Sequence, residues 1–235
     1  RTRLADAHGA TVELAGIMIQ RPLGNRTKGG LLKRMWRLYG SFGLARQVLR
    51  YAYRRGAPWR HGVAEQASRA GVPVLGLRNA NGSKFVSFVK QNEIDLVVSV
   101  SAAQIFKTQI LHAPRLGCIN LHNAPLPRYR GMLPNFWQMY HDEPYSVLTI
   151  HSMVEDLDKG NVLLQRSTPI EEGMSLEDLI RRTKTRSARA LWNVLDGFAH
   201  ATLSPQPLPA DGGSYFSWPT RAEAREFRRR GKRLL

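Results

Sequence analysis

Short apolar runs of strand length alternate along this chain with longer segments of helical periodicity, and this alternation constrains the fold more than any other feature. Asp95–Val100 is typical of an interior parallel strand, and it follows an amphipathic segment at Ser83–Gln91. Such alternation favours right-handed βαβ crossovers. The sequence therefore predicts an α/β fold with a Rossmann-like, open, mostly parallel sheet flanked by helices. The other predicted strands are Val12–Ile19, Val72–Leu77, Leu116–Leu121 and Ser146–Met153, and the other predicted helices are Leu31–Arg55, His61–Ala70 and Ser175–Ala199.

The two ends of the chain depart from this alternation. The first residues resemble the end of a helix, so we expect the opening strand of the sheet to be missing from the sequence. Gly40 and Gly43 predict that the helix at Leu31–Arg55 is kinked or split. A Pro-rich stretch follows Ser204. We therefore predict one domain over residues 1–204, followed by a Pro-rich linker and a basic C-terminal tail over 205–235.

Positive charge is abundant and unevenly distributed. The chain has 35 Lys and Arg against 18 Asp and Glu, a formal charge of +17. No acidic residue lies between Glu13 and Glu65, a span that holds eleven basic residues, and a second basic cluster lies at 221–233. Such a surface attracts nucleic acid, anionic lipid or phosphorylated small molecules, and it is equally consistent with a solvated basic face.

Other features of composition bear on location. No apolar run is long enough to cross a membrane, and the first residues have no secretory signal. Cys118 is the only cysteine and cannot form an internal disulfide, which suits a reducing compartment. We expect a cytoplasmic protein with possible association at a membrane surface, and we expect Cys118 to be a core residue.

An amide, an imidazole and a carboxylate are predicted to meet at one edge of the sheet. Asn120 and His122 lie two apart at the end of a strand, so their side chains share a face. Asp158 follows the end of the next predicted strand. The carboxyl edge of an open α/β sheet is where ligands bind. An N-x-H at a strand end is also often structural, and that alternative stays open.

These three groups suit acyl transfer to an amine. The histidine can polarise or protonate the acyl oxygen, the asparagine amide can donate to an oxyanion, and the aspartate can orient the imidazole and accept a proton. No Ser or Cys nucleophile accompanies them, which favours direct transfer. The histidines away from this region lack metal-ligand spacing, and we predict no metal site. We expect His151 to be a packed core residue, and Glu155 and Asp156 to be solvated.

The ordered motifs N-L-H-x(3)-L-P-R-Y-R-G, P-x(2)-W, T-I-H-x-M and L-D-x-G resemble the folate-dependent formyltransferase family over residues 94–165. The resemblance implies 10-formyltetrahydrofolate as co-substrate and Asn120, His122 and Asp158 as the catalytic residues. It also implies a folate pocket between two loops, and an acceptor site near the R-Y-R-G and tryptophan motifs. The implied folate-binding residues are Ser101, Ala102, Ala103, Gln104, Ile105, Val154, Glu155, Asp156 and Leu157, and the implied acceptor-binding residues are Arg128, Tyr129, Arg130 and Trp137.

The acceptor amine is the least determined part of the resemblance. Pro125 resembles the enzymes that formylate amino sugars on nucleotides, and it departs, like Ala124 and Leu148, from the commonest family pattern. We expect a phosphorylated or nucleotide-linked amino sugar, or one on a lipid carrier. Methionyl-tRNA formyltransferases would append a C-terminal barrel, for which the residues after Ser204 are too few. A methionyl-tRNA formyltransferase-like enzyme, with RNA on the basic helices, and a non-catalytic polyanion or membrane-surface binder remain alternatives.

Overall fold

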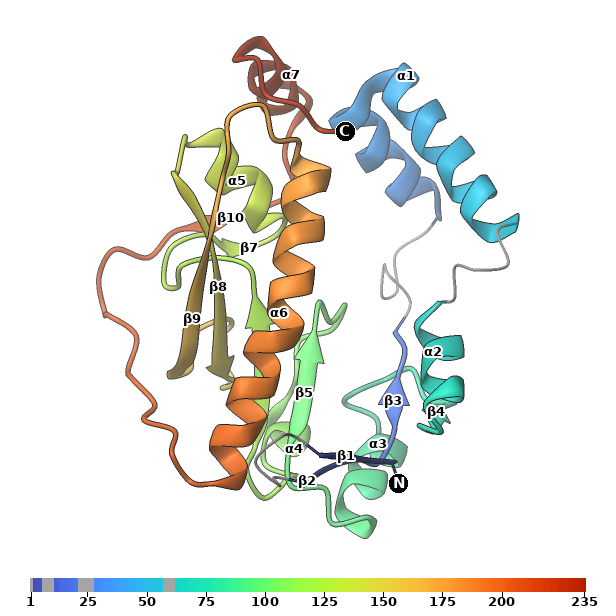
Figure 1. The fold of residues 1–235 in the computed structure, drawn as a ribbon, viewed down its shortest axis with the longest axis vertical. Coiled ribbons are helices and arrows are strands. Elements are labelled where there is room, and N and C mark those ends of the chain that lie inside the picture. The colour runs from blue at the N-terminus through green and yellow to red at the C-terminus, as the bar shows by residue number, and fades with distance from the viewer. Residues whose placement is uncertain (1, 6–10, 21–27, 57–61) are drawn as a thin grey trace.

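A four-stranded sheet forms the centre of the molecule in the computed structural model, which describes residues 2–5, 11–20, 28–56 and 62–235 (Figure 1). Its strands and the helices around it are β5 (Val97–Val100), β6 (Cys118–His122), β8 (Tyr145–Ser152), β9 (Val162–Pro169), α3 (Ser83–Gln91), α4 (Thr108–Leu111), α5 (Pro134–Tyr140) and α6 (Leu176–Ala199). The strand order is β5-β6-β8-β9. Neighbouring residues of β6 pack on opposite faces: Cys118 contacts a cluster formed with α3 and α4, and Ile119 contacts a cluster formed with α6. The sheet is therefore covered on both faces.

The predicted α/β class with a central sheet between helices is confirmed, but the strand directions are more mixed than expected. β5 pairs with β6 in parallel, whereas β6–β8 and β8–β9 are antiparallel. Only residues 153–161 join β8 to β9, which is too short for the crossover that a parallel pair requires. The strand predicted to be interior, β5, lies at the edge of this four-stranded sheet.

The N-terminal prediction is wrong in detail. Residues expected to end a helix form β1 (Thr2–Ala5), which pairs antiparallel with β2 (Thr11–Leu14). The single strand predicted at Val12–Ile19 is split, since β3 (Ile17–Met18) instead pairs in parallel with β4 (Val74–Leu75). The helix predicted at His61–Ala70 is α2 (Val63–Arg69), and His61 itself lies outside the described residues.

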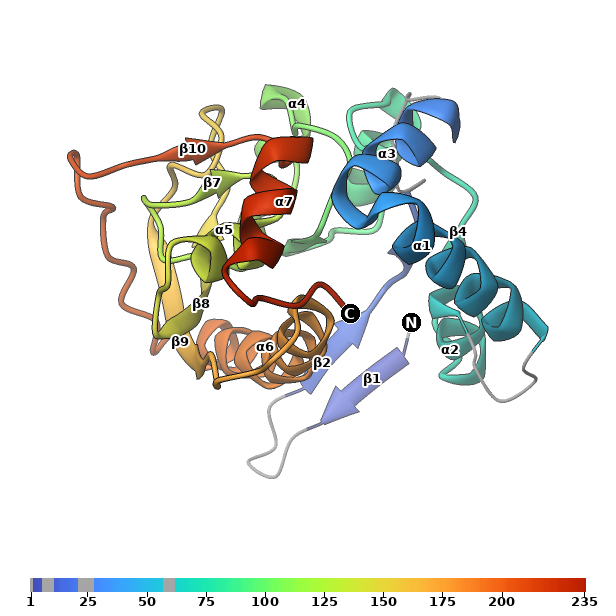
Figure 2. The same cartoon turned by 90° about the horizontal axis from the view of Figure 1, so that it is seen from above.

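The long basic helix α1 (Lys28–Gly56) consists of two helices that meet at Gly40. Gly40 has φ 70°, a left-handed conformation that costs glycine little and other residues more. Before the kink, Leu38 is only 2% exposed and packs in one cluster with Phe136 and Phe227. Figure 2 shows the second half of α1 running away from the sheet toward α2. The predicted interruption at Gly40 is thus present, and it changes what the helix packs against.

The segment expected to be a linker and basic tail packs on the rest of the protein. β10 (Tyr215–Phe216) pairs in parallel with β7 (Arg130–Gly131). α7 (Arg221–Arg229) begins with a capping box between Thr220 and Glu223 and buries Phe227 completely. The segment is therefore more than a tail, because it contributes side chains to the same core as α5. The domain boundary at residue 204 stays a prediction.

Among the helices of the described residues, none has the length and apolar content needed to cross a membrane.

Candidate functional site

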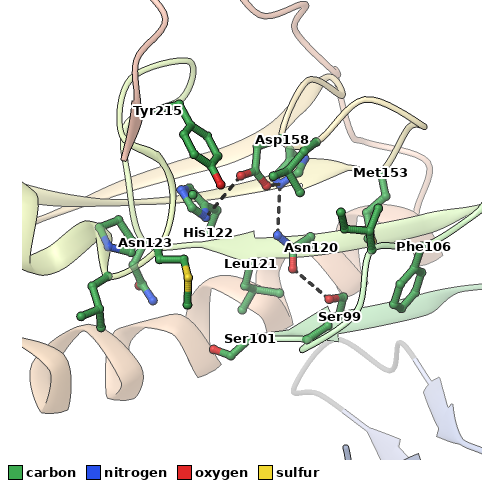
Figure 3. Close-up of a pocket in the computed structure, with 18 of the residues that line it drawn as sticks. Ser99, Ser101, Phe106, Asn120, Leu121, His122, Asn123, Met153, Asp158 and Tyr215 are labelled. Carbon is green, nitrogen blue, oxygen red and sulfur yellow. Dashed lines mark hydrogen bonds and ion pairs between the residues drawn. The ribbon is translucent and has the colours of Figure 1, made fainter. Parts of the chain in front are cut away.

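A cavity of about 520 Å³ opens where β5, β6 and β8 end (Figure 3). Asn120, His122 and Asp158 all line it, so the structure brings together the three residues predicted to be catalytic. The first two project from β6 with the period of a strand, and Asp158 comes from the loop between β8 and β9.

The β8–β9 loop turns tightly to bring Asp158 back to the sheet. Asp158 has a left-handed φ of 54°. Two residues later, a Cβ on Gly160 would lie 1.8 Å from the carbonyl oxygen of Ser152. Glycine is therefore required here for the chain to pass the end of β8, which gives the D-x-G spacing a structural cause.

Hydrogen bonds fix which nitrogen of His122 faces the cavity. Its Nε2 lies 3.0 Å from the carbonyl oxygen of Tyr129, which can only accept, so Nε2 carries a proton. Its Nδ1 faces Asp158 Oδ2 at 3.9 Å. Nδ1 is therefore the atom that gains or loses a proton, beside a carboxylate that stabilises the charged form.

The amide of Asn120 is held from both sides. Ser99 Oγ on β5 donates to Asn120 Oδ1 at 2.9 Å. Asn120 Nδ2 lies 3.3 Å from His151 Nε2 on β8. His151 Nδ1 lies 2.8 Å from the carbonyl oxygen of Ser152, so in the neutral ring Nε2 is the acceptor. This leaves the second Nδ2 hydrogen of Asn120 available to a ligand.

Burial and mutual charge set the protonation of the histidine and the carboxylate. Burial lowers the pKa of His122, although Asp158 and the Tyr129 carbonyl act in the opposite direction. Burial by itself would raise the pKa of Asp158, but His151, His122 and the Gly131 backbone N–H together hold it below its ordinary value. Near neutral pH the site therefore contains a neutral imidazole and an ionised carboxylate.

His151 was predicted to be a core residue, and it is only 2% exposed, yet it also belongs to the site. Its Nε2 is 3.6 Å from Asp158 Oδ1, and it lines the cavity. In the β6–β8 register it lies directly opposite Asn120. The sequence showed its alternation in a strand but not this pairing, which depends on antiparallel β6 and β8.

The two loops predicted to hold the folate do lie along the cavity. Eight of the nine residues line it, and the ninth, Ala103, instead donates its backbone N–H to Gln20 Oε1. Glu155 accepts a 2.5 Å hydrogen bond from Thr108 Oγ1, so its carboxylate is engaged by α4. Sequence analysis did not identify several other lining residues, which are Ser99, Phe106, Met153, Ile180, Lys184 and Tyr215.

The four residues predicted to bind the acceptor do not line the cavity. Arg128 Nη1 and Tyr129 OH both donate to Glu143 Oε1 at 2.7 Å. Trp137 is 4% exposed and stacks on Phe216. Within the R-Y-R-G motif, Gly131 reaches the cavity, and the carbonyl of Tyr129 holds His122. Acceptor binding by these four residues stays a prediction. The hydrogen bonds of Arg128 and Tyr129 to Glu143 hold the loop that carries them.

The described residues give no sign of metal or thiol chemistry. They contain no group of three or more His, Cys, Asp or Glu side chains that could hold a metal ion. Cys118 is buried on the α3 side of β6, and burial raises the pKa of its thiol to about 12. It is a core side chain, as expected.

Comparison with known proteins shows which family the chain resembles. The formyl transferase family model matches residues 51–195. A methionyl-tRNA formyltransferase of Pelobacter propionicus is 37% identical over 145 residues, which cover 62% of this chain and 46% of the relative. A sugar N-formyltransferase from a Shewanella species is 26% identical with a TM-score of 0.55, covering 68% of this chain and 61% of that one.

A formyltransferase from Anoxybacillus kamchatkensis, solved with a UDP-linked formamido sugar and tetrahydrofolate, is 23% identical with a TM-score of 0.52. Its alignment covers 65% of this chain and 77% of that one, and at this identity it shows the fold alone. The chain spans about half the length of the curated relatives that it matches. Since the family model matches more than half of its residues, this chain belongs to the formyl transferase family.

Proposed function

We propose that this chain transfers a formyl group from 10-formyltetrahydrofolate to a primary amine. The proposal rests on one observation: Asn120, His122 and Asp158 line the same cavity. Burial and the charges around them keep His122 neutral and Asp158 ionised near neutral pH. Membership of the formyl transferase family supports the same chemistry.

The cavity fits a folate in size and lining. Its volume of about 520 Å³ falls within the usual range for small-molecule sites. Ile105, Val154 and Leu157 are exposed apolar side chains from the two loops that border it, and an exposed apolar patch beside polar groups is typical of a binding site. These loops would hold the pterin, and Glu155 stabilises them through Thr108.

Each of the three polar residues has a defined task in this proposal. When bound, the folate supplies an activated formyl carbon to the acceptor nitrogen and takes up a proton at its own nitrogen as the old bond breaks. The free Nδ2 hydrogen of Asn120 stabilises the negative charge that develops on the formyl oxygen. His122 Nδ1, neutral at the outset, accepts the proton that the amine loses, and ionised Asp158 stabilises the imidazolium that forms. While it carries that proton, Nδ1–H donates a hydrogen bond to the same formyl oxygen. The proton would then pass to the folate nitrogen as its bond to the formyl carbon breaks, which returns the imidazole to its neutral form.

Two acceptor classes are supported by different observations. The named sequence relatives are methionyl-tRNA formyltransferases, which favours an aminoacyl-tRNA amine. The sugar N-formyltransferase at 26% identity favours an amino sugar, for which we propose a nucleotide or lipid carrier. Lys184 of α6 lines the cavity and is exposed, so it would serve a phosphorylated acceptor of either class. On identity the methionyl-tRNA acceptor has the stronger support.

One experiment separates these acceptors and tests the activity itself. The protein is incubated with 10-formyltetrahydrofolate and either methionyl-tRNA or a set of amino-sugar nucleotides, and products are identified by a mass gain of one formyl group. Asp158→Asn provides the matched inactive control. Formyl transfer to no amine under these conditions would contradict the proposal and favour a non-catalytic polyanion binder. A cytoplasmic location stays a prediction.

A further inference from the structure

The second half of α1 directs an apolar stripe toward solvent. Phe42, Ala45, Leu49, Ala52 and Tyr53 recur every three or four residues and therefore share one helical face. Phe42 is 85% exposed, Leu49 70% and Tyr53 68%. A helix that packs on a protein core normally turns such a stripe inward.

The kink at Gly40 explains why this half of the helix differs from the first. Before it, Leu38 is buried against α5 and α7, and Arg228 Nη1 donates to its carbonyl. After it, the side facing the protein carries half-buried Leu44, Gln47 and Arg50, and Arg50 makes two hydrogen bonds to Glu177. The second half of α1 lies at the outer edge of the molecule (Figure 1), and the exposed fractions of Phe42, Leu49 and Tyr53 show that its stripe is not covered by the described residues.

Positive charge lies beside the stripe at Arg46 and continues on the first half of α1 and on α7. Arg46 is exposed beside it, and Lys33 and Arg37 are exposed on the first half. α1 contains eight Lys and Arg and no acidic residue. α7, which contacts α1, adds exposed Arg225 and places the guanidinium of Arg221 4.6 Å from the ring centre of Trp36. An occupant of this surface must accept apolar side chains and carry negative charge.

We infer that the second half of α1 is an interfacial helix that binds the surface of an anionic lipid bilayer. A basic helix with an exposed apolar stripe inserts that stripe at the headgroup boundary while its cations contact anionic lipid. A second copy of the chain fits poorly, because two acid-free helices would repel each other. RNA fits poorly too, since phosphates need the cations but give Leu49 and Val48 nothing to pack against.

Co-sedimentation with vesicles tests this inference, using phosphatidylcholine alone and phosphatidylcholine mixed with phosphatidylglycerol. The protein should bind the mixed vesicles and leave the neutral ones in solution, and added salt should weaken binding. Phe42→Ser with Leu49→Ser should lower the partition coefficient about tenfold or more, and Arg46→Glu should lower it several-fold. The matched control, Val63→Ser with Tyr145→Ser, removes two side chains that are 62% and 51% exposed elsewhere and should bind like the parent.

A spectroscopic variant tests insertion without relying on loss of binding. The emission of Phe42→Trp should shift to shorter wavelength on mixed vesicles, and that of Val63→Trp should not. The inference is overturned if the parent ignores mixed vesicles, or if the double serine variant binds them like the parent. A third result would overturn it too. If Arg46→Glu weakened binding to tRNA and to vesicles equally, and the double serine variant bound both like the parent, the surface would bind polyanions by charge alone. Formyl transfer to a dissolved acceptor should be the same in every variant as in the parent. If neither the parent nor the variants transferred a formyl group, that result would contradict the proposed function but not the binding of α1 to a bilayer.

Discussion

His122 and Asp158 face each other across 3.9 Å, and their surroundings decide how each behaves. Period-two alternation was sufficient to predict that Asn120 and His122 share a face. The contact of His151 with Asp158 and the hydrogen bond from Ser99 could not be predicted, because both depend on which strands become neighbours. The sequence also did not show how the R-Y-R-G loop folds: Tyr129 has a φ of 59°, and its carbonyl contacts His122.

Removing either polar group on β6 should abolish most activity while the fold survives. His122→Ala and Asn120→Ala are each expected to lower turnover by about 10²-fold or more, since an acid–base group or an oxyanion donor contributes on that scale. Turnover is measured on purified variants whose circular dichroism matches the parent. Near-normal turnover in either would remove that residue from the proposed mechanism.

The choice of carboxylate can be tested within one loop. Asp158→Asn should reduce turnover as severely as the histidine change, because it removes the carboxylate that stabilises the imidazolium. Asp156→Asn, two residues away, is the matched control: it is exposed and pairs with Lys159, so its effect should be small. An inactive Asp156→Asn beside an active Asp158→Asn would show that the wrong carboxylate was chosen.

The lowered pKa of His122 also predicts how stability depends on pH. The unfolded chain binds a proton at an ordinary histidine pKa of 6.5, whereas the buried ring resists protonation. Its contribution to stability is therefore present above pH 6.5 and is lost as the pH falls below that value. The thermal midpoint of the parent should fall more steeply below pH 6.5 than that of His122→Gln. Parallel curves would mean that the buried ring is protonated as easily as an exposed one.

Helices with clear ends were predicted well at the scale of elements. α3 was predicted to the residue, and α6 begins after Ser175, whose hydroxyl accepts from the Asp178 N–H. Strand pairing was predicted less well, because a short apolar run such as Val12–Ile19 does not reveal its neighbours. The packing of α7 on the core was not predicted either, because most of its residues are polar. Only Ala224 and Phe227 of its nine residues are buried.

Phe227 should therefore be far more important for stability than its place in a basic segment suggests. It is fully buried and stacks on Phe136 with ring centres 4.7 Å apart. Phe227→Ala should lower the free energy of unfolding by about 3–5 kcal/mol. Phe42→Ala is the matched control, since Phe42 is 85% exposed and should change stability little. Equal denaturation midpoints for parent and Phe227→Ala would show that α7 does not contribute to the core.

Charge acts at the scale of the whole molecule: the chain has a formal charge of +17, and Lys184 lines the cavity. Such a field raises the rate at which an anionic acceptor arrives, by about tenfold or more, and salt screens it. The kcat/KM for a phosphorylated acceptor at saturating folate should therefore fall about tenfold or more from low to high salt. The same amine without its phosphates should show little dependence, and Lys184→Gln should reduce the dependence for the phosphorylated acceptor. If salt lowered kcat/KM equally for both acceptors, the positive charge would not serve to attract the acceptor. It would then be a solvated face, or it would serve the bilayer contact of α1.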